Sequence, residues 1–190
     1  RLISSGAVDF LLGGPPCSTF SRARFRRDSP GPRPLRDRGA GAWGLPFLSA
    51  REEAQVLEAN LLLSNYLSLC AAAMTAGRCF VLEHPADPGP PLPSIWSMAE
   101  VHVLEADRSC RRHLFHQCMF GAATVKPTCV LSNVHIPALD GVVCDGGHSH
   151  NSSRGKDACG NFRTRALAAY PRGLCQVLAE AALSFCFKGG

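Results

Sequence analysis

The chain has 190 residues, of which 46% are hydrophobic and 18% charged, and its formal net charge is +5. This length suits one domain with a sizeable core, and so apolar a composition excludes a chain that is disordered throughout. The longest apolar segment, residues 54–76, is interrupted by polar side chains, so we expect no membrane span.

The first half of the chain predicts a strand, a long loop and a helix. Residues 8–12 are an apolar run that ends at Gly-Gly-Pro-Pro (13–16), as expected of a buried strand followed by a sharp loop. Residues 18–48 are rich in Arg, Pro and Gly and show no periodicity, which predicts a long loop. Ser49 and Glu52 have the spacing of a capping box, and the apolar residues that follow predict a largely buried helix.

The second half continues the alternation of strands and helices. Residues 79–82 predict a second buried strand that ends at Glu83. The later predicted elements are a short helix, two strands, a glycine-rich polar loop and a final helix, at residues 94–100, 113–118, 128–134, 137–165 and 171–187. Such alternation is typical of a parallel α/β sheet, in which ligands bind outside the carboxyl ends of the strands. We therefore expect the polar segments 13–21 and 83–85 to lie side by side.

The chain contains ten cysteines, a content below that of a disulfide scaffold. Several of them lie inside apolar patterns, where a reduced core thiol is the ordinary interpretation. The prediction is an intracellular, reducing compartment, either nuclear or cytoplasmic. Because the chain begins without Met, we also expect it to be a fragment of a longer protein.

Cys17 and Glu83 are the candidate chemical groups. Two prolines hold Cys17 directly after the first strand, and the arginine-rich segment beyond it is expected to lower the thiol pKa and favour the nucleophilic thiolate. Glu83, at the end of the neighbouring strand, can serve as a proton donor if it is desolvated. The alternative is a small core cysteine and a solvated loop carboxylate.

Residues 14–21, Gly-Pro-Pro-Cys-Ser-Thr-Phe-Ser, resemble the nucleophile motif of cytosine-5 DNA methyltransferases. Residues 80–85 are similar to the next motif of that family. Residues 117–128, together with 144–155 and 170–175, resemble segments of its divergent phage-type and retroelement-associated members. The resemblance implies an α/β fold with a Rossmann-like S-adenosylmethionine-dependent methyltransferase sheet. In this chain we expect that sheet to be incomplete, with its first strands missing and with them the glycine-rich motif for the methyl donor.

The resemblance also implies a mechanism and a partner. Cys17 attacks carbon 6 of a cytosine flipped out of DNA, Glu83 donates a proton to ring nitrogen 3, and S-adenosylmethionine supplies the methyl group. It places Pro15 and Pro16 at the border of the cofactor. The implied DNA contacts are Ser18, Ser21, Arg22 and Arg24. Without the donor motif, we expect these 190 residues alone to be inactive; the alternative is a non-catalytic nucleic-acid-binding module.

The glycine-rich loop suggests a metal. Its cysteine and histidine side chains are the ordinary ligands of tetrahedral zinc, and the candidates are Cys144, His148, His150 and Cys159. Cys118 is an alternative to Cys159. A zinc-stabilised structural module is therefore a further hypothesis. We expect three parts in the chain: the catalytic half of a methyltransferase-like α/β domain with the arginine-rich loop 18–48 (1–136), the possible zinc loop (137–165) and a C-terminal helix that packs back on the domain (166–190).

Overall fold

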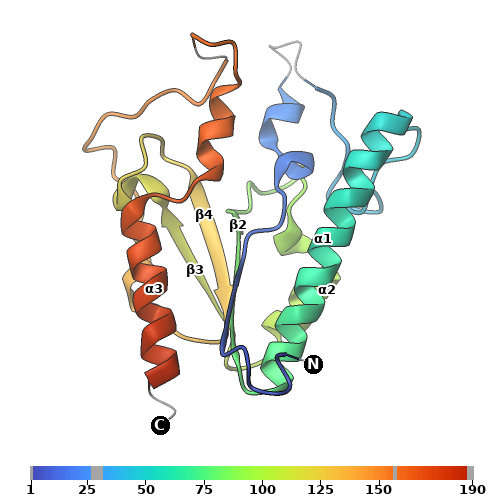
Figure 1. Cartoon of the computed structure of the whole chain (residues 1–190). Coiled ribbons are helices and arrows are strands. Elements are labelled where there is room, and N and C mark those ends of the chain that lie inside the picture. The colour runs from blue at the N-terminus through green and yellow to red at the C-terminus, as the bar shows by residue number, and fades with distance from the viewer. Residues whose placement is uncertain (1, 27–31, 156–157, 188–190) are drawn as a thin grey trace.

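The computed structural model describes residues 2–26, 32–155 and 158–187, in which a four-stranded sheet lies between helices (Figure 1). The strands are β1 (Phe10–Gly13), β2 (Cys79–Pro85), β3 (Arg111–His116) and β4 (Pro127–Ser132). The helices are α1 (Ala50–Thr75), α2 (Ala99–Glu105) and α3 (Arg172–Phe187). Short 3-10 turns lie between them, at Ser18–Phe20, Arg22–Phe25, Ile95–Ser97, Gln117–Phe120, Pro137–Leu139 and Arg163–Ala168.

The sheet has the order β1-β2-β4-β3, and its strands do not all run the same way. β1 and β2 are parallel, whereas β4 is antiparallel to both β2 and β3. The prediction of a parallel sheet is therefore wrong for β4. Only residues 117–126 connect β3 to β4, which is too short for the crossover that parallel strands need. The architecture is mixed α/β and compatible with a Rossmann-like fold.

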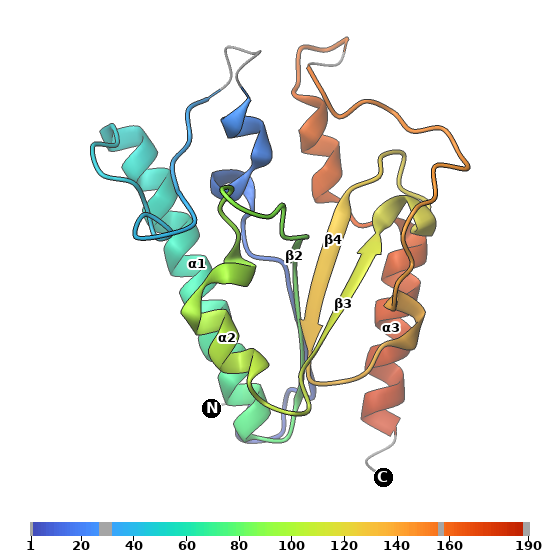
Figure 2. The same ribbon diagram turned by 180° about the vertical axis from the view of Figure 1, so that it is seen from behind.

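Helices cover both faces of the sheet, so the central strand is apolar along most of its length. In β2, Phe80 and Leu82 belong to the core beneath α1 and α2, whereas Cys79 and Val81 belong to the core beneath α3. Figure 2 shows the same layers from behind, with α1 and α2 on one side of the strands and α3 on the other. This two-sided burial explains why residues 79–82 are continuously hydrophobic rather than alternating.

The long helix α1 begins as predicted and is less buried than predicted. The Ser49 N–H donates to Glu52 Oε2 at 2.9 Å, which is half of a capping box. Its buried residues form one stripe, Val56, Ala59, Leu63, Leu67, Cys70 and Ala73. Leu57 and Leu61, by contrast, are 59% and 61% exposed, because the stripe at helical spacing is the part that packs on the sheet.

By length and composition alone, α1 is long and apolar enough to span a membrane. The sequence predicts no such segment. Of the most apolar window of α1, 33% is buried inside the protein. A core helix can be equally long and apolar, so this finding is weak evidence for a membrane.

Candidate functional site

The ends of β1 and β2 bring Cys17 and Glu83 to the same edge of the sheet. The parallel register pairs Gly13 with Leu82, so the chain leaves β1 beside Glu83. The approach is close enough that a Cβ atom on Gly14 would lie 2.8 Å from Glu83 Oε2. The prediction that the two polar segments lie side by side is confirmed. Glu83 itself is still part of β2, which extends to Pro85 and so is longer than predicted.

Cys17 is exposed at this edge, directly before the 18–20 turn, in which the Phe20 N–H donates to the Cys17 carbonyl at 3.0 Å. The pKa of its thiol is raised, first by desolvation and then by the charge of Glu83, while Lys126 acts in the opposite direction. The expectation that arginines lower this pKa is therefore wrong. The nearby charges that act on the thiol are those of Glu83 and Lys126.

Glu83 is a buried carboxyl with one satisfied oxygen. Its side chain is 6% exposed, and the Tyr170 hydroxyl donates to Oε2 at 3.0 Å. Within the described part of the chain, Oε1 is buried and has no hydrogen-bond partner. Burial raises the pKa of Glu83, although Lys126 and the Tyr170 hydrogen bond oppose the shift. A carboxyl in this state can carry a proton at a higher pH than an ordinary glutamate does.

Lys126 and Tyr170 complete the cluster, although their sequence patterns alone predict no role for either residue. Lys126 Nζ donates to the Leu167 carbonyl at 2.7 Å and lies 5.7 Å from the centre of the Tyr170 ring. Burial, followed by the charge of Glu83, raises the pKa of Tyr170, so its hydroxyl stays protonated as a donor. Lys126 lies in the segment 117–128 and Tyr170 in the segment 170–175, and the motif patterns of these two segments were the available signal.

Gly14 is required by this packing. A Cβ atom there would lie 2.7 Å from the Tyr170 hydroxyl oxygen and 2.8 Å from Glu83 Oε2. We expect Gly14→Ala to separate Tyr170 from Glu83 and to destabilise the fold by about 1–3 kcal/mol, as overpacking does. Thermal unfolding measures the change. Gly39→Ala is the matched control, because its Cβ would meet only Asp37 Oδ1, at 3.7 Å. Equal melting temperatures for the two variants would contradict the contact.

His84 follows Glu83 and takes no part in the exposed site. Its ring is buried and lies edge-on to Phe20, with 5.5 Å between ring centres, and to Trp96, with 6.4 Å. Burial lowers its pKa to about 3, so the ring is neutral. His84 is a packing residue, and Glu83 is instead oriented by its strand pairing and by Tyr170.

The residues predicted to contact DNA lie in the two turns after Cys17. Ser18 and Arg22 are exposed. Ser21 Oγ accepts the Ala23 N–H at 3.2 Å, and Arg24 Nε donates to the Ser18 carbonyl at 2.9 Å. The serine hydroxyl and the Arg24 guanidinium therefore stabilise the segment itself. Of the predicted cofactor residues, Pro15 is buried and Pro16 exposed at the same edge.

Three arginines of the 18–48 segment support the fold, and Arg27 lies outside the described residues. Arg36 is fully buried, with its guanidinium 4.2 Å from the centre of the Phe20 ring and Nε donating to Thr19 Oγ1 at 2.9 Å. Burial lowers the pKa of Arg36 to about 10. Two ion pairs, Arg33–Glu52 and Arg38–Asp87, bind this segment to the rest of the chain. Hence the charge of the arginine run is not all available to a polyanion.

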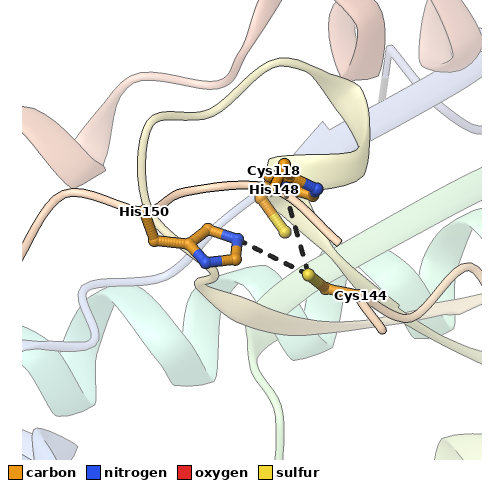
Figure 3. Close-up of side chains that lie close together, drawn as sticks. All are labelled: Cys118, Cys144, His148 and His150. Atoms are coloured by element: carbon orange, nitrogen blue, oxygen red, sulfur yellow. Dashed lines mark hydrogen bonds between the residues drawn. The ribbon is translucent and has the colours of Figure 1, made fainter. Parts of the chain in front are cut away.

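A second group of reactive side chains, the metal cluster, consists of Cys118, Cys144, His148 and His150 (Figure 3). Their ligand atoms all lie within 4.8 Å of one another. Three predicted ligands are therefore brought together, but Cys159 is not among them, and Cys118 takes its place. The reason is that β3 ends at His116, earlier than predicted, so Cys118 lies in the 117–120 turn beside the loop.

A third cluster has the composition of a catalytic triad and is structural. His113 Nδ1 lies 2.6 Å from Asp140 Oδ1, and Ser132 Oγ lies 3.5 Å from His113 Nε2. However, Ser132 is fully buried and its hydroxyl donates to the Val134 carbonyl. A nucleophile needs access to substrate, so this cluster instead holds the 137–139 turn against β3 and β4.

Asp140 also binds His135, with 2.6 Å between Oδ2 and Nε2, and hydrogen bonds to His135 and His113 lower its pKa. Its contribution to stability is therefore present above its ordinary pKa of 3.8 and is lost as the pH falls through the lower, folded value. We expect Asp140→Asn to lose about 1 kcal/mol or less at neutral pH, since the carboxylate is half exposed, and to flatten the acid limb. Melting temperatures measured against pH test this, with the exposed Glu58→Gln as control. Identical acid limbs in both variants would contradict it.

A cavity of about 560 Å³ lies beside Lys126 and Tyr170 of the first cluster. Gln117 and Asn151, each next to a metal-cluster residue, line one part of it, and Lys126 and Tyr170 line another. The cavity is therefore lined by two residues of the first cluster and by sequence neighbours of the metal cluster.

No family model matches this chain, and no curated protein and no solved structure matches it either.

Proposed function

We propose that the chain is a cytosine-5 DNA methyltransferase-like domain in which Cys17 is the nucleophile and Glu83 the proton donor. The observation that supports this is an exposed thiol under the electrostatic influence of a buried carboxyl at the neighbouring strand end. The motif resemblance of residues 14–21 and 80–85 agrees with the same two side chains. Ten cysteines and buried core thiols such as Cys70 suit the reducing compartment that we propose for it.

The proposed chemistry divides one difficult substitution into two steps. The Cys17 thiolate bonds to carbon 6 of a cytosine flipped out of DNA, and Glu83 passes its proton to ring nitrogen 3, so no net negative charge accumulates on the ring. S-adenosylmethionine, when bound, supplies the methyl group that carbon 5 accepts. A solvent base then removes the carbon-5 proton, the sulfur–carbon bond breaks to restore the thiolate, and the nitrogen-3 proton returns to Glu83.

The charges of the cluster suit this exchange. Because Glu83 raises the pKa of the Cys17 thiol, the two groups resist being negative together, and the reactive state that we propose for the pair holds one proton. When Glu83 holds that proton, Cys17 is the thiolate and Lys126 stabilises it. Tyr170 occupies Oε2 of Glu83, so Oε1 is the oxygen that we assign to proton transfer.

We propose that the methyl-donor site and the DNA lie at the same end of the sheet, at the carboxyl ends of β1 and β2. Pro15 and Pro16 would border that site. We assign the DNA phosphates to the turns after Cys17, with the contacts Ser18, Ser21, Arg22 and Arg24; such contacts provide affinity without sequence choice.

The test is a trapping reaction that requires no methyl donor. A DNA oligonucleotide that carries pyrimidin-2-one in place of one cytosine has a carbon 6 that accepts a thiolate directly. Incubation with the 190-residue chain is expected to yield a covalent complex attached at Cys17, identified by peptide mass spectrometry. DNA binding without any adduct would support the non-catalytic nucleic-acid-binding module instead.

A second candidate function, a zinc-stabilised structural module, is favoured by the metal cluster. Two cysteines and two histidines are an ordinary tetrahedral zinc set, and four protein ligands leave no open position for chemistry. We therefore propose that zinc at this site is structural. Elemental analysis of the purified chain should find about one zinc per molecule; a chain that contains none and binds none on titration would exclude this function.

A further inference from the structure

The 117–120 turn, which carries Cys118 of the metal cluster, is bonded to the segment that carries Lys126. The Gln117 N–H donates to the Lys126 carbonyl at 3.2 Å, and the Cys118 N–H donates to the Val125 carbonyl at 3.4 Å. The Gln117 side chain also donates to Thr128 Oγ1 at 3.1 Å. These bonds close the connection between β3 and β4, so a displacement of Cys118 is transmitted to Lys126.

The same turn contacts the start of α3, two residues after Tyr170. A Cβ atom on Gly173 would lie only 2.8 Å from the Phe120 carbonyl oxygen, so the helix rests directly on the turn. The Cys175 N–H donates to the Pro171 carbonyl at 3.1 Å, which ties the residue after Tyr170 to this helix. The 117–120 turn therefore contacts the segment that carries Lys126 and the helix that follows Tyr170, and these are the two side chains that act on Glu83.

The other three residues of the metal cluster lie on a loop that is attached at both ends. The His116 N–H donates to the Val142 carbonyl at 2.9 Å, and the Asn151 N–H donates to the Ala123 carbonyl at 2.7 Å. Between these attachments, residues 143–150 form no helix or strand. A metal that binds both Cys118 and the loop would add the cross-link that secondary structure does not provide here.

The arrangement of the cluster fits tetrahedral zinc. Cys144 Sγ lies 3.5 Å from His150 Nε2 and 3.9 Å from His148 Nε2. Across a tetrahedral zinc with ordinary Zn–S and Zn–N bonds, sulfur and nitrogen lie about 3.6 Å apart. The Gly146 N–H donates to Cys144 Sγ at 3.3 Å, a bond that stabilises a thiolate ligand.

From these contacts we infer that zinc at Cys118, Cys144, His148 and His150 acts on the methyltransferase-like site from a distance, as a positioning centre for Lys126 and Tyr170. This inference rests on the proposed zinc. The metal holds the loop against the 117–120 turn, and the turn holds the two side chains that contact or neutralise Glu83.

Amide hydrogen exchange of the zinc-loaded and zinc-stripped chain, both kept reduced, tests the inference. Removal of zinc is expected to speed exchange about tenfold in peptides covering residues 117–126 and 142–151, and measurably in residues 168–173. The α1 peptides are the internal reference and should not change. Cys144→Ser is expected to match the stripped chain, whereas Cys159→Ser should keep its zinc and its protection. Cys118→His, which retains a zinc ligand, should rescue the protection that Cys118→Ser loses.

The rate of the pyrimidin-2-one adduct provides a second readout, which we expect to fall about tenfold without zinc. Exchange that is unchanged at 117–126 after zinc removal would overturn the inference and leave the zinc itself standing. Failure of the chain to bind zinc would overturn both the inference and the proposed zinc site. If no form of the chain makes the adduct, zinc-dependent protection at 117–126 and 168–173 would still support the inference, and the catalytic proposal would fail alone.

Discussion

Replacement of Cys17 by serine is expected to abolish the covalent complex with pyrimidin-2-one DNA, a loss of at least about a thousandfold in rate. The physical reason is that the reaction forms a sulfur–carbon bond, and a serine hydroxyl ionises far less readily than a thiol. Since Cys17 is exposed, the substitution should leave the fold intact, and DNA affinity should change little. The measurement is the time course of the gel-shifted complex under denaturing conditions.

The control must remove an exposed thiol elsewhere. Cys186, at the far end of α3, is exposed and lies away from Glu83, so Cys186→Ser should form the adduct at the unmodified rate. An adduct that persists in Cys17→Ser, with mass spectrometry placing it on another cysteine, would reject Cys17 as the nucleophile.

Replacement of Glu83 by glutamine is expected to change two reactions in opposite directions. Without the carboxylate, the second contribution that raises the pKa of Cys17 disappears, so alkylation of the thiol by iodoacetamide at neutral pH should become faster. The adduct with pyrimidin-2-one DNA should nevertheless form about 100-fold more slowly, because glutamine cannot supply a proton to ring nitrogen 3.

The pH dependence separates the two effects. In the unmodified chain, the adduct rate should follow a bell, because the reactive pair holds one proton and loses activity when it holds two or none. Glu83→Gln should retain only the rising limb, which reflects ionisation of the thiol. If alkylation and adduct formation both slow, or if the falling limb persists in Glu83→Gln, then Glu83 is not the proton donor.

Unfolding of Glu83→Gln is not expected to explain its slower adduct formation. Burial raises the pKa of Glu83, so its contribution to stability is greatest below its ordinary value of 4.5 and declines as the pH rises through the folded value. At neutral pH, a neutral glutamine in the same position should therefore be at least as stable. Thermal unfolding of both proteins across this range checks the sign.

Local patterns in the sequence predicted the elements that depend on neighbouring residues. The apolar runs at 8–12 and 79–82 became β1 and β2, because continuous burial requires continuous apolarity. Ser49 and Glu52 predicted where α1 begins, because a capping contact spans a single turn. The placement of Cys17 beside Glu83 followed from these elements, since parallel neighbours end at one edge.

Local patterns of neighbouring residues do not predict the contacts between distant segments. The approach of Lys126 and Tyr170 to Glu83 joins three separate parts of the chain. Desolvation, followed by the charge of Glu83, raises the Cys17 pKa that the arginines were expected to lower. Arg36 turns inward because Phe20 and Thr19 offer it a ring face and an acceptor.

The sequence by itself determined the order of the strands and the long helices, with their bounds to within a few residues, and placed Cys17 and Glu83 at the ends of the first two strands. The tertiary structure alone decided that β4 runs antiparallel, and that Cys118 rather than Cys159 joins the loop cysteine and histidines. The physical reason is that periodicity and capping act over a few residues, whereas strand direction, burial of charge and ligand geometry depend on which distant surfaces pack together.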